Sequence, residues 1–257
     1  MNLMNFFSSN SYTYDDLEVI THVISSTKVA RKLIENDNFD LRFDWSIFFS
    51  FAKAAQLSNG TIQILDFGGA AGIYFDLFKS TFECSSLNWV IIEGNEFVTK
   101  LSNEQMSENI EVYSELNPVR DKFKTFDMVI LNSVLQYLVK PFDIIKEILQ
   151  FQPKVIHIGK TPMSKDRLIS GLQFSKLESH GPCHIPLANN YEIENRVNIL
   201  DFDSLNNVLS NNYENVIPRK SGDFEVYEDR FRFFKKKTMV NTYDFSCFGV
   251  KYDSDRR

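Results

Sequence analysis

The sequence predicts an α/β protein in which helices cover both faces of a doubly wound, mostly parallel sheet. Short apolar runs alternate with helical stretches from about residue 61 onward, which is typical of parallel strands joined by helical crossovers. The first apolar run leads directly into a glycine-rich turn. The chain has 257 residues, enough for one large domain, and its 43% hydrophobic and 24% charged residues exclude a disordered chain.

The first sixty residues are expected to form a helical cap on this single domain. Residues 13–16 have the spacing of a helix N-cap, and apolar residues follow at helical spacing from Leu17, with a break expected at 25–27. A second helix is expected over about 44–57, and Gly60 is placed to end it.

The next hundred residues are expected to form the cofactor-binding half. The expected strands are 61–67, 88–92, 109–113, 126–131 and 154–158, and the expected helices are 73–79 and 142–149. Pro141 favours a helix start at the second of these helices because proline is well tolerated in a first turn.

The remainder divides into a substrate-loop region and a sheet-closing part. Residues 161–200 lack strong periodicity and contain several proline and glycine breakers, so an irregular segment is expected there. In the part from 201 to 257, Asp203 is expected to cap a short helix, and 213–217 and 243–250 are expected strands.

The most informative motif is the turn after the first strand, Asp66-Phe67-Gly68-Gly69-Ala70-Ala71-Gly72. Such a turn lets a ligand approach the backbone and the N–H groups of a helix start. The dinucleotide pattern fails because Ala70 and Ile73 stand where it needs glycine, and no Gly-Lys-Ser/Thr follows for a P-loop. Asp66 would repel a pyrophosphate but suits a ligand with an ammonium group.

An acid at the end of the second strand adds a contact for a ribose. Glu93 lies 21 residues after Gly72, where a carboxylate can accept both ribose hydroxyls. S-adenosyl-L-methionine combines an amino-acid end with a ribose. Asp66 and Glu93 together therefore predict S-adenosyl-L-methionine as the cofactor.

Residues 61–162 resemble the class I S-adenosylmethionine-dependent methyltransferases. The glycine turn is similar to their first motif, Glu93 to their ribose-binding acid, and residues 126–133 to their fourth motif. This resemblance implies a seven-stranded, Rossmann-like sheet whose last strand is antiparallel, supplied by 243–250. It also implies that the loop with Glu115 contacts adenine.

The cofactor-binding residues that follow from the motif and the resemblance lie at the carboxyl ends of the expected strands. The last two would lie against the methionine portion of the cofactor. The complete set is Asp66, Gly68, Gly69, Gly72, Glu93, Glu115, Asn132 and Ser133.

A narrower resemblance points to methyltransferases of bacterial surface-polysaccharide (O-antigen and capsule) clusters. It rests on Asp-Phe-Gly-Gly at 66–69, on Asn-Ser-Val-Leu-Gln-Tyr-Leu at 132–138 and on Lys-Thr-Pro at 160–162. In that group an Asp-Arg pair precedes Thr-Pro, whereas this chain has Gly159-Lys160. The role of that acid therefore has no counterpart at this position.

Acceptor chemistry is expected from the segment after the fifth strand. Methyl transfer is an in-line displacement, and a base assists it when the acceptor is a hydroxyl. His180 and His184 are candidate bases, and Tyr137 is an alternative substrate contact. The alternatives are surface histidines without a role and a tyrosine that packs on the sheet. Cys183 completes a His-x-x-Cys-His spacing, but without a second ligand cluster no metal is expected.

The predicted function is O-methylation of a sugar or glycoconjugate precursor. The alternatives are a small-molecule methyltransferase of another class, such as an N-methyltransferase, and a non-catalytic S-adenosylmethionine-binding or scaffolding protein. The net charge of −6 argues against a nucleic-acid partner. Residues 161–257 carry 14 basic and 14 acidic groups, so an anionic acceptor is compatible with this part.

Composition also indicates a cytoplasmic protein. There are 3 cysteines, no basic leader at the N-terminus and no apolar window long enough to span a membrane. The oligomeric state is left open. The 24 Phe, 10 Tyr and 2 Trp are expected to fill the core, and the Phe-Arg-Phe-Phe-Lys-Lys-Lys run at 231–237 is expected to be a guarded edge strand.

Overall fold

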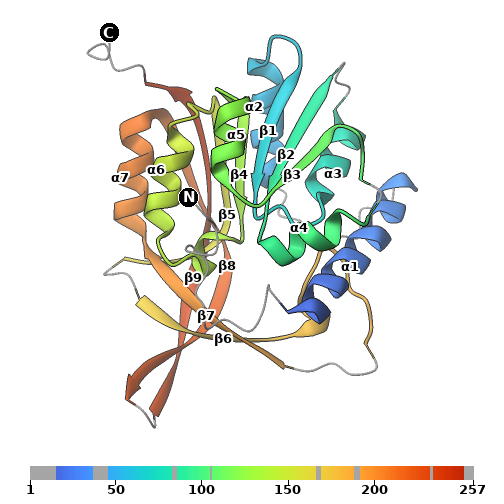
Figure 1. Ribbon diagram of the computed structural model, residues 1–257. Helices are drawn as coiled ribbons and strands as arrows, with labels where there is room; N and C mark the ends of the chain where they lie inside the picture. Colours follow the sequence, from blue (N-terminus) through green and yellow to red (C-terminus); the bar gives the residue numbers. More distant parts are fainter. Residues whose placement is uncertain are drawn as a thin grey trace.

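The computed structural model describes residues 16–36, 46–82, 86–104, 106–165, 169–187, 192–231 and 234–251. In this part of the chain nine strands form one sheet with the order β3-β2-β1-β4-β5-β7-β6-β8-β9, and β5 also pairs with β9 (Figure 1). The strands are β1 (Ile62–Phe67), β2 (Leu87–Ile92), β3 (Ile110–Tyr113), β4 (Met128–Asn132), β5 (Val155–Ser164), β6 (Ile169–Lys176), β7 (Glu192–Asp201), β8 (Tyr213–Phe231) and β9 (Phe234–Val250).

The helices follow the alternation that the sequence predicts. They are α1 (Leu17–Glu35), α2 (Ser46–Leu57), α3 (Ile73–Thr81), α4 (Asn95–Leu101), α5 (Leu116–Lys122), α6 (Pro141–Leu149) and α7 (Phe202–Asn212), with 3₁₀ turns η2 (Leu135–Tyr137) and η3 (Leu177–Ser179). The short helices α4 and α5 were not expected. No helix among the described residues is long and apolar enough to cross a membrane.

Strands β1 to β5 form the parallel part of the sheet. Strand β9 runs antiparallel to β5, from Phe248 opposite Val155 to Asn241 opposite Met163, and supplies the antiparallel strand expected at 243–250. The sheet is therefore mixed. The expected count of seven strands was wrong, because β6 and β7 add two more.

The expected irregular region at 161–200 contains paired strands instead. Strand β6 pairs antiparallel with β7 over the whole length of β6, from Ile169 opposite Ile199 to Lys176 opposite Glu192. The glycine and proline breakers at 181–186 lie between these strands. Buried and exposed residues alternate along β7, but the buried position 195 is an asparagine, which obscures the apolar alternation in the sequence.

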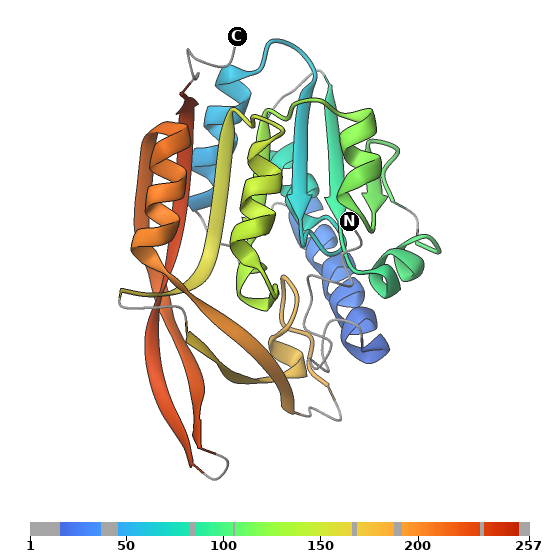
Figure 2. The ribbon, with the colours of Figure 1, turned by 60° about the vertical axis from the view of Figure 1, so that its left-hand side comes forward.

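The additional pairings close a ring of five strands. The ring runs β5–β7–β6–β8–β9 and returns to β5. It encloses a small apolar cluster of Val197, Ile199 and Val226. Strands β6 and β7 pass below the carboxyl ends of the parallel strands, and the β8–β9 hairpin extends beyond them (Figures 1 and 2).

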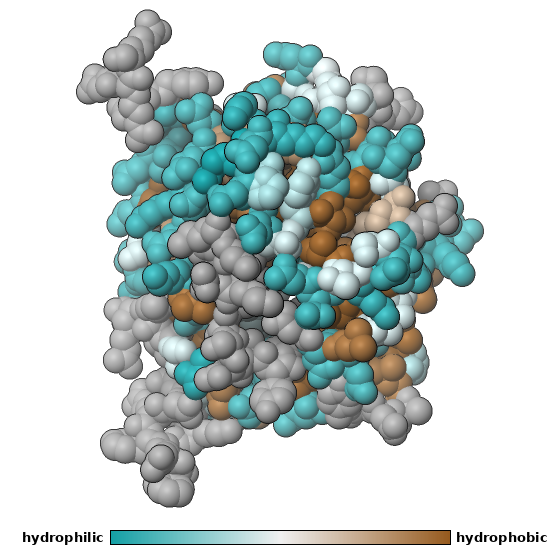
Figure 3. Space-filling view, viewed as in Figure 1, coloured by the Kyte–Doolittle hydropathy of each residue, from teal (hydrophilic) through white to brown (hydrophobic). Residues whose placement is uncertain are grey.

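Two apolar cores lie on opposite faces of the parallel sheet. Helices α2 and α3 and the end of α1 cover one face, where Phe51, Phe75 and Phe78 pack edge-on against Trp89. Helices α5, α6 and α7 cover the other face. Hydrophilic side chains cover most of the outer surface of these three helices (Figure 3). Most of the largest fully buried side chains are phenylalanines, which confirms that the aromatic residues of the described chain fill the core.

Helix ends differ in detail from the sequence-based expectations. Helix α1 runs through residues 25–27 without the expected break, and the hydroxyls of Ser25 and Thr27 donate to backbone carbonyls one turn earlier. Asp16 caps α1, and Asp201 caps α7 in place of the expected Asp203. Residues 13–15 and 44–45 lie outside the described residues. The side chains of residues 231–236, in the basic run at 231–237, also lie outside the described residues.

Candidate active site

The glycine turn between β1 and α3 follows a backbone path that only small residues allow. Gly68 and Gly72 have φ angles of 73° and 78°. A Cβ at Gly68 would lie 2.6 Å from Val134 Cγ2, and one at Gly69 would lie 2.4 Å from Asp66 Cγ. Gly68 therefore lets the turn lie close to Val134, which follows β4, and Gly69 lets it lie close to the side chain of Asp66.

Asp66 lies beneath this turn and does not line the cavity above it. Its side chain is 1% exposed, and Trp89 Nε1–H donates to its Oδ2 at 3.3 Å. Burial raises the pKa of Asp66 to about 7; the Trp89 hydrogen bond lowers it, and the neighbouring charge of Glu93 raises it further. The structure thus places Asp66 as a support of the turn.

Glu93 follows β2 and faces the turn from the side. Its Oε1 accepts from Ala70 N–H at 2.8 Å, and its Oε2 accepts from Gly94 N–H at 3.2 Å. The residue is 9% exposed and contributes to the cavity wall. Because a carboxylate has about four acceptor sites, it can keep these bonds and accept ribose hydroxyls.

The ends of β4 and β5 form the next part of the wall. Asn132 Nδ2–H donates to the hydroxyl of Tyr74, and Ser133 N–H donates to Gly159 O at 2.8 Å. A Cβ at Gly159 would lie 2.0 Å from Asn132 Oδ1, so this position needs glycine for Asn132 to keep its place. Asn132 and Ser133 line the cavity.

Lys160 lies in the cavity wall at an irregularity in β5. The register with β9 shifts between Ile158 and Thr161, and Lys160 has a φ of 49°. Its N–H donates to Asp244 Oδ1 at 2.8 Å, so the displaced amide is satisfied by a buried side chain of β9. Bulges beside active sites commonly redirect a side chain in this way.

Left-handed backbone is concentrated at this site. Among the described non-glycine residues, Ala70, Ser133, Gln152 and Lys160 have positive φ, and all but Gln152 line the cavity. Each such residue costs roughly 1–3 kcal/mol, so the surrounding structure must hold it in place. This clustering is typical of a ligand-binding site.

The cavity itself has a volume of about 340 Å³ and lies at the carboxyl edge of the parallel strands. It begins at the glycine turn and extends between η2 and the β6–η3 segment. It is lined by Val23, Thr27, Gly68, Gly69, Ala70, Ile73, Tyr74, Glu93, Asn132, Ser133, Val134, Tyr137, Lys160, Gln173, Ser175, Ser179, His180, Gly181 and Pro182.

The far end of the cavity carries neutral polar groups. Tyr137 O–H donates to Gln173 Oε1 at 3.0 Å, and Ser175 Oγ and His180 Nε2 share a hydrogen bond of 2.9 Å. His180 is 8% exposed. Burial, followed by the neighbouring His22, lowers the pKa of His180 to about 4. The imidazole is therefore neutral at pH 7.

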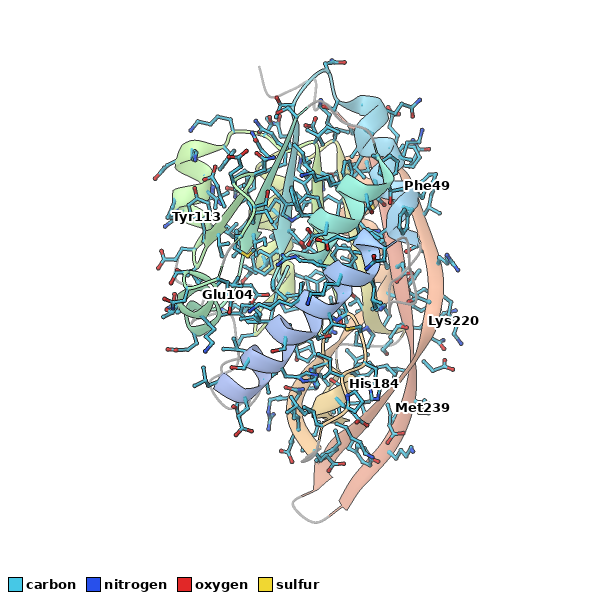
Figure 4. The ribbon with its side chains drawn as sticks, turned by 90° about the vertical axis from the view of Figure 1, so that its right-hand side faces the viewer. Phe49, Glu104, Tyr113, His184, Lys220 and Met239 are labelled. Carbon is cyan, nitrogen blue, oxygen red and sulfur yellow. The ribbon has the colours of Figure 1, made fainter. Side chains whose placement is uncertain are left out.

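The structure brings most of the sequence-predicted site residues together. Those in the cavity wall are Gly68, Gly69, Glu93, Asn132, Ser133, Tyr137 and His180. Asp66 lies below the turn, Gly72 precedes α3, and Glu115 precedes α5 away from the wall. His184 is exposed on the segment after η3 (Figure 4).

Sequence reasoning missed Tyr74, Lys160, Gln173 and Ser175 in the wall. The alternation of Leu172 and Phe174 with the polar Gln173 and Ser175 could have indicated a strand with one polar face. Among the described residues, no group of three or more His, Cys, Asp or Glu side chains is arranged to hold a metal ion.

The topology and the cavity define the general class of this protein. It is an α/β protein whose cavity lies at the carboxyl edge of the sheet, where the strand order reverses between β1 and β4. Open α/β sheets bind ligands at such a switch point.

The chain is similar to solved structures but matches no family model and no curated protein sequence. A DhpI–SAH complex shows 11% identity and a TM-score of 0.40, covering 89% of this chain and 98% of that one. The METTL16 MTase domain shows 11% identity and a TM-score of 0.45, covering 89% and 80%.

A third similar structure is a Burkholderia thailandensis 1,6-didemethyltoxoflavin-N1-methyltransferase with bound 1,6-didemethyltoxoflavin and S-adenosylhomocysteine. It shows 11% identity and a TM-score of 0.43, covering 96% of this chain and 93% of that one. Since all three TM-scores lie below 0.5, the function is inferred from this chain's own motifs and cavity.

Proposed function

We propose that this protein is an S-adenosylmethionine-dependent methyltransferase. The proposal rests on one cavity that has a candidate cofactor site at one end and a candidate acceptor site at the other. The glycine turn and Glu93 lie at one end, and the Ser175–His180 pair lies at the other. A cofactor site that opens onto a buried, neutral base would allow both the alignment and the base assistance that speed methyl transfer to a hydroxyl.

The residues at the first end fit the proposed cofactor. The small residues of the turn admit a ligand close to the backbone, Glu93 offers carboxylate oxygens to ribose hydroxyls, and Asn132 and Ser133 would face the methionine portion. When bound, S-adenosylmethionine supplies an electrophilic methyl group on a sulfonium. Asp66 keeps the turn in place from below.

At the other end we propose that a hydroxyl of a sugar or similar small molecule is the acceptor. Neutral His180 takes the proton of this hydroxyl, either directly or through Ser175, with which it shares a hydrogen bond. Lys160 in the wall is compatible with an acceptor that carries an anionic group. A cytoplasmic role in surface-polysaccharide synthesis belongs to the same proposal and is supported by the sequence resemblance.

Calorimetric titration with S-adenosylmethionine tests the cofactor site. Glu93→Ala should weaken binding by about 1–3 kcal/mol, or roughly 5- to 150-fold, because ribose hydroxyls lose a charged acceptor. Glu93→Gln keeps an oxygen for Ala70 N–H and should also weaken binding. The control is Glu96→Ala, an exposed residue of α4 outside the cavity wall, which should bind as the unchanged protein does.

Failure to bind S-adenosylmethionine by protein free of carried-over cofactor would refute the proposal. Transfer of a labelled methyl group separates the alternatives. A labelled methyl group on an oxygen of a sugar product supports O-methylation, and one on a nitrogen indicates the N-methyltransferase alternative. Binding without transfer to any tested acceptor or to cell extract favours a non-catalytic protein.

A further inference from the structure

A buried asparagine adjoins the acceptor end of the cavity without hydrogen-bond partners. Asn195 lies in β7 and is 0% exposed. Neither its Nδ2 nor its Oδ1 has a hydrogen-bond partner among the described residues. Buried amides are almost always paired, and an unpaired one costs roughly 1–3 kcal/mol. A fold without a use for this polar side chain would be more stable with an apolar residue.

The strand register directs Asn195 toward the cavity. Asn195 is directly opposite Gln173 in the antiparallel β6–β7 pair, so both side chains are on the same face of the pair. Gln173 lines the cavity. Directly opposite residues have Cβ atoms about 4.5–5.5 Å apart, so a ligand that contacts Gln173 comes within reach of the Asn195 amide.

A second buried amide lies on the opposing element. Gln136 of η2 is 1% exposed, and its Oε1 has no hydrogen-bond partner among the described residues, while its Nε2–H donates to Ser133 Oγ. Turn η2 packs against β7, where Asn198 Nδ2–H donates to Leu138 O at 2.7 Å. Unpaired amide atoms therefore lie on η2, which borders the acceptor end of the cavity, and on β7, which pairs with the bordering strand β6.

From this arrangement we infer an acceptor subsite formed by Tyr137, Gln173 and Asn195, with Gln136 beside it, for a neutral group that carries several hydroxyls, such as a sugar ring. The inference rests on the proposed function and specifies its substrate class. Amides and a phenol both donate and accept, as hydroxyls do, so adjacent hydroxyls can pair with the amide N–H and C=O together. A purely apolar group would leave these atoms unpaired.

The first test needs no acceptor. Asn195→Leu replaces an unpaired buried amide with an apolar side chain of similar size, so the urea midpoint of the protein alone should rise. The matched control is Asn198→Leu in the same strand, which should lower the midpoint because the removed amide is paired with Leu138 O. A lower midpoint for Asn195→Leu would show that Asn195 serves the fold, and would overturn the subsite.

The second test measures methyl transfer from labelled S-adenosylmethionine to methyl glucoside, methyl mannoside, methyl galactoside, UDP-glucose, GDP-mannose, uridine and an amine. We expect transfer to a sugar hydroxyl. In Asn195→Leu and Gln173→Leu the KM for that sugar should rise at least about tenfold with kcat largely retained. Affinity for S-adenosylmethionine should not change.

The outcomes distinguish the subsite from the proposed function. Unchanged KM values in both variants, transfer to the nucleobase or amine alone, or transfer to none of the sugars would overturn the subsite while leaving cofactor binding intact. No binding of S-adenosylmethionine by the unchanged protein would instead refute the proposed function itself.

Discussion

At the scale of single residues, the site depends on two acids in different surroundings. Asp66 is enclosed beneath the glycine turn, where Trp89 Nε1–H donates to it, and Glu93 accepts backbone N–H groups at the cavity wall. Backbone N–H bonds favour a carboxylate, whereas enclosure without a cation favours a carboxylic acid. Glu93 therefore lines the cavity, where the proposed cofactor would contact it, whereas Asp66 contacts the turn from beneath.

Asp66→Asn should change how stability depends on pH. The folded-state pKa of Asp66 is raised from 3.8 to about 7. Protonation of Asp66 therefore stabilises the folded protein fully below pH 3.8, and this stabilisation is lost as the pH rises toward 7. Asparagine does not titrate and can still accept from Trp89. We expect the free energy of unfolding of the variant, measured with urea and without cofactor, to rise by about 2 kcal/mol relative to that of the unchanged protein when the pH is raised from 5 to 7.5.

One outcome of this comparison would contradict the assignment of Asp66 as a neutral group. If the difference in unfolding free energy between Asp66→Asn and the unchanged protein is the same at both pH values, Asp66 is ionised throughout. Its environment would then have to include a cation or further donors, and its role as a neutral support of the turn would be wrong.

At the scale of elements, one end of the cavity is built largely by segments outside the parallel strands β1 to β4. Strand β6 and turn η3 follow the parallel sheet and bring Ser175 and His180 to the cavity, five residues apart in the chain. The bulge in β5 adds Lys160 from the sheet itself. In the proposed function, the parallel strands would supply the cofactor end, and β6 with η3 would supply the groups that bind and activate an acceptor.

His180→Gln tests this division between the elements. Loss of a general base should lower kcat by about 10²- to 10⁴-fold, whereas affinity for S-adenosylmethionine should be unchanged because the proposed cofactor contacts come from the glycine turn, Glu93, Asn132 and Ser133, and not from His180. Since the pKa of His180 is lowered to about 4, kcat of the unchanged protein should not fall on the acid side until the pH approaches that value. The measurement is labelled methyl transfer as a function of pH with a sugar acceptor.

The exposed His184 provides a matched control for this substitution. His184→Gln changes a histidine four residues away that does not line the cavity, so its kcat should equal that of the unchanged protein. Equal losses in the two variants, or a loss confined to His184→Gln, would exclude His180 as the base.

At the scale of the whole molecule, the cavity wall is shared by parts of the chain that are distant in sequence. Helix α1 contributes Val23 and Thr27, the parallel sheet contributes the turn and the end of β4, and the closed ring of strands contributes β6. Residues of β8 and β9 also belong to the core beneath α6 and α7. A ligand in the cavity therefore connects all three parts.

Cofactor binding should stabilise these parts together. At about 100 times its Kd, S-adenosylmethionine should raise the unfolding free energy by about 2.7 kcal/mol. Amide hydrogen exchange should slow in α1, at the end of β4 and in β6, not only in the glycine turn. Slower exchange confined to the turn would show that the cavity is not one site, and Glu93→Ala at the same cofactor concentration serves as the control.

The sequence by itself determined the parallel half of the fold and its cofactor motif. Parallel strands buried on both faces are nearly continuous apolar runs, and the turn from Gly68 to Gly72 needs small residues for local reasons, so both are visible without tertiary contacts. The carboxyl ends of such strands meet at one edge, which is why Glu93, Asn132 and Ser133 could be assigned to one site.

Tertiary structure alone decided the acceptor end of the cavity. Strands β6 and β7 pair across the breakers at 181–186, and only that pairing places Asn195 opposite Gln173, which lines the cavity. The tertiary structure also encloses His180 beside His22 and leaves His184 exposed, although both His180 and His184 lie in one short segment. Burial and long-range pairing depend on which distant segments meet, and local residue patterns do not record that.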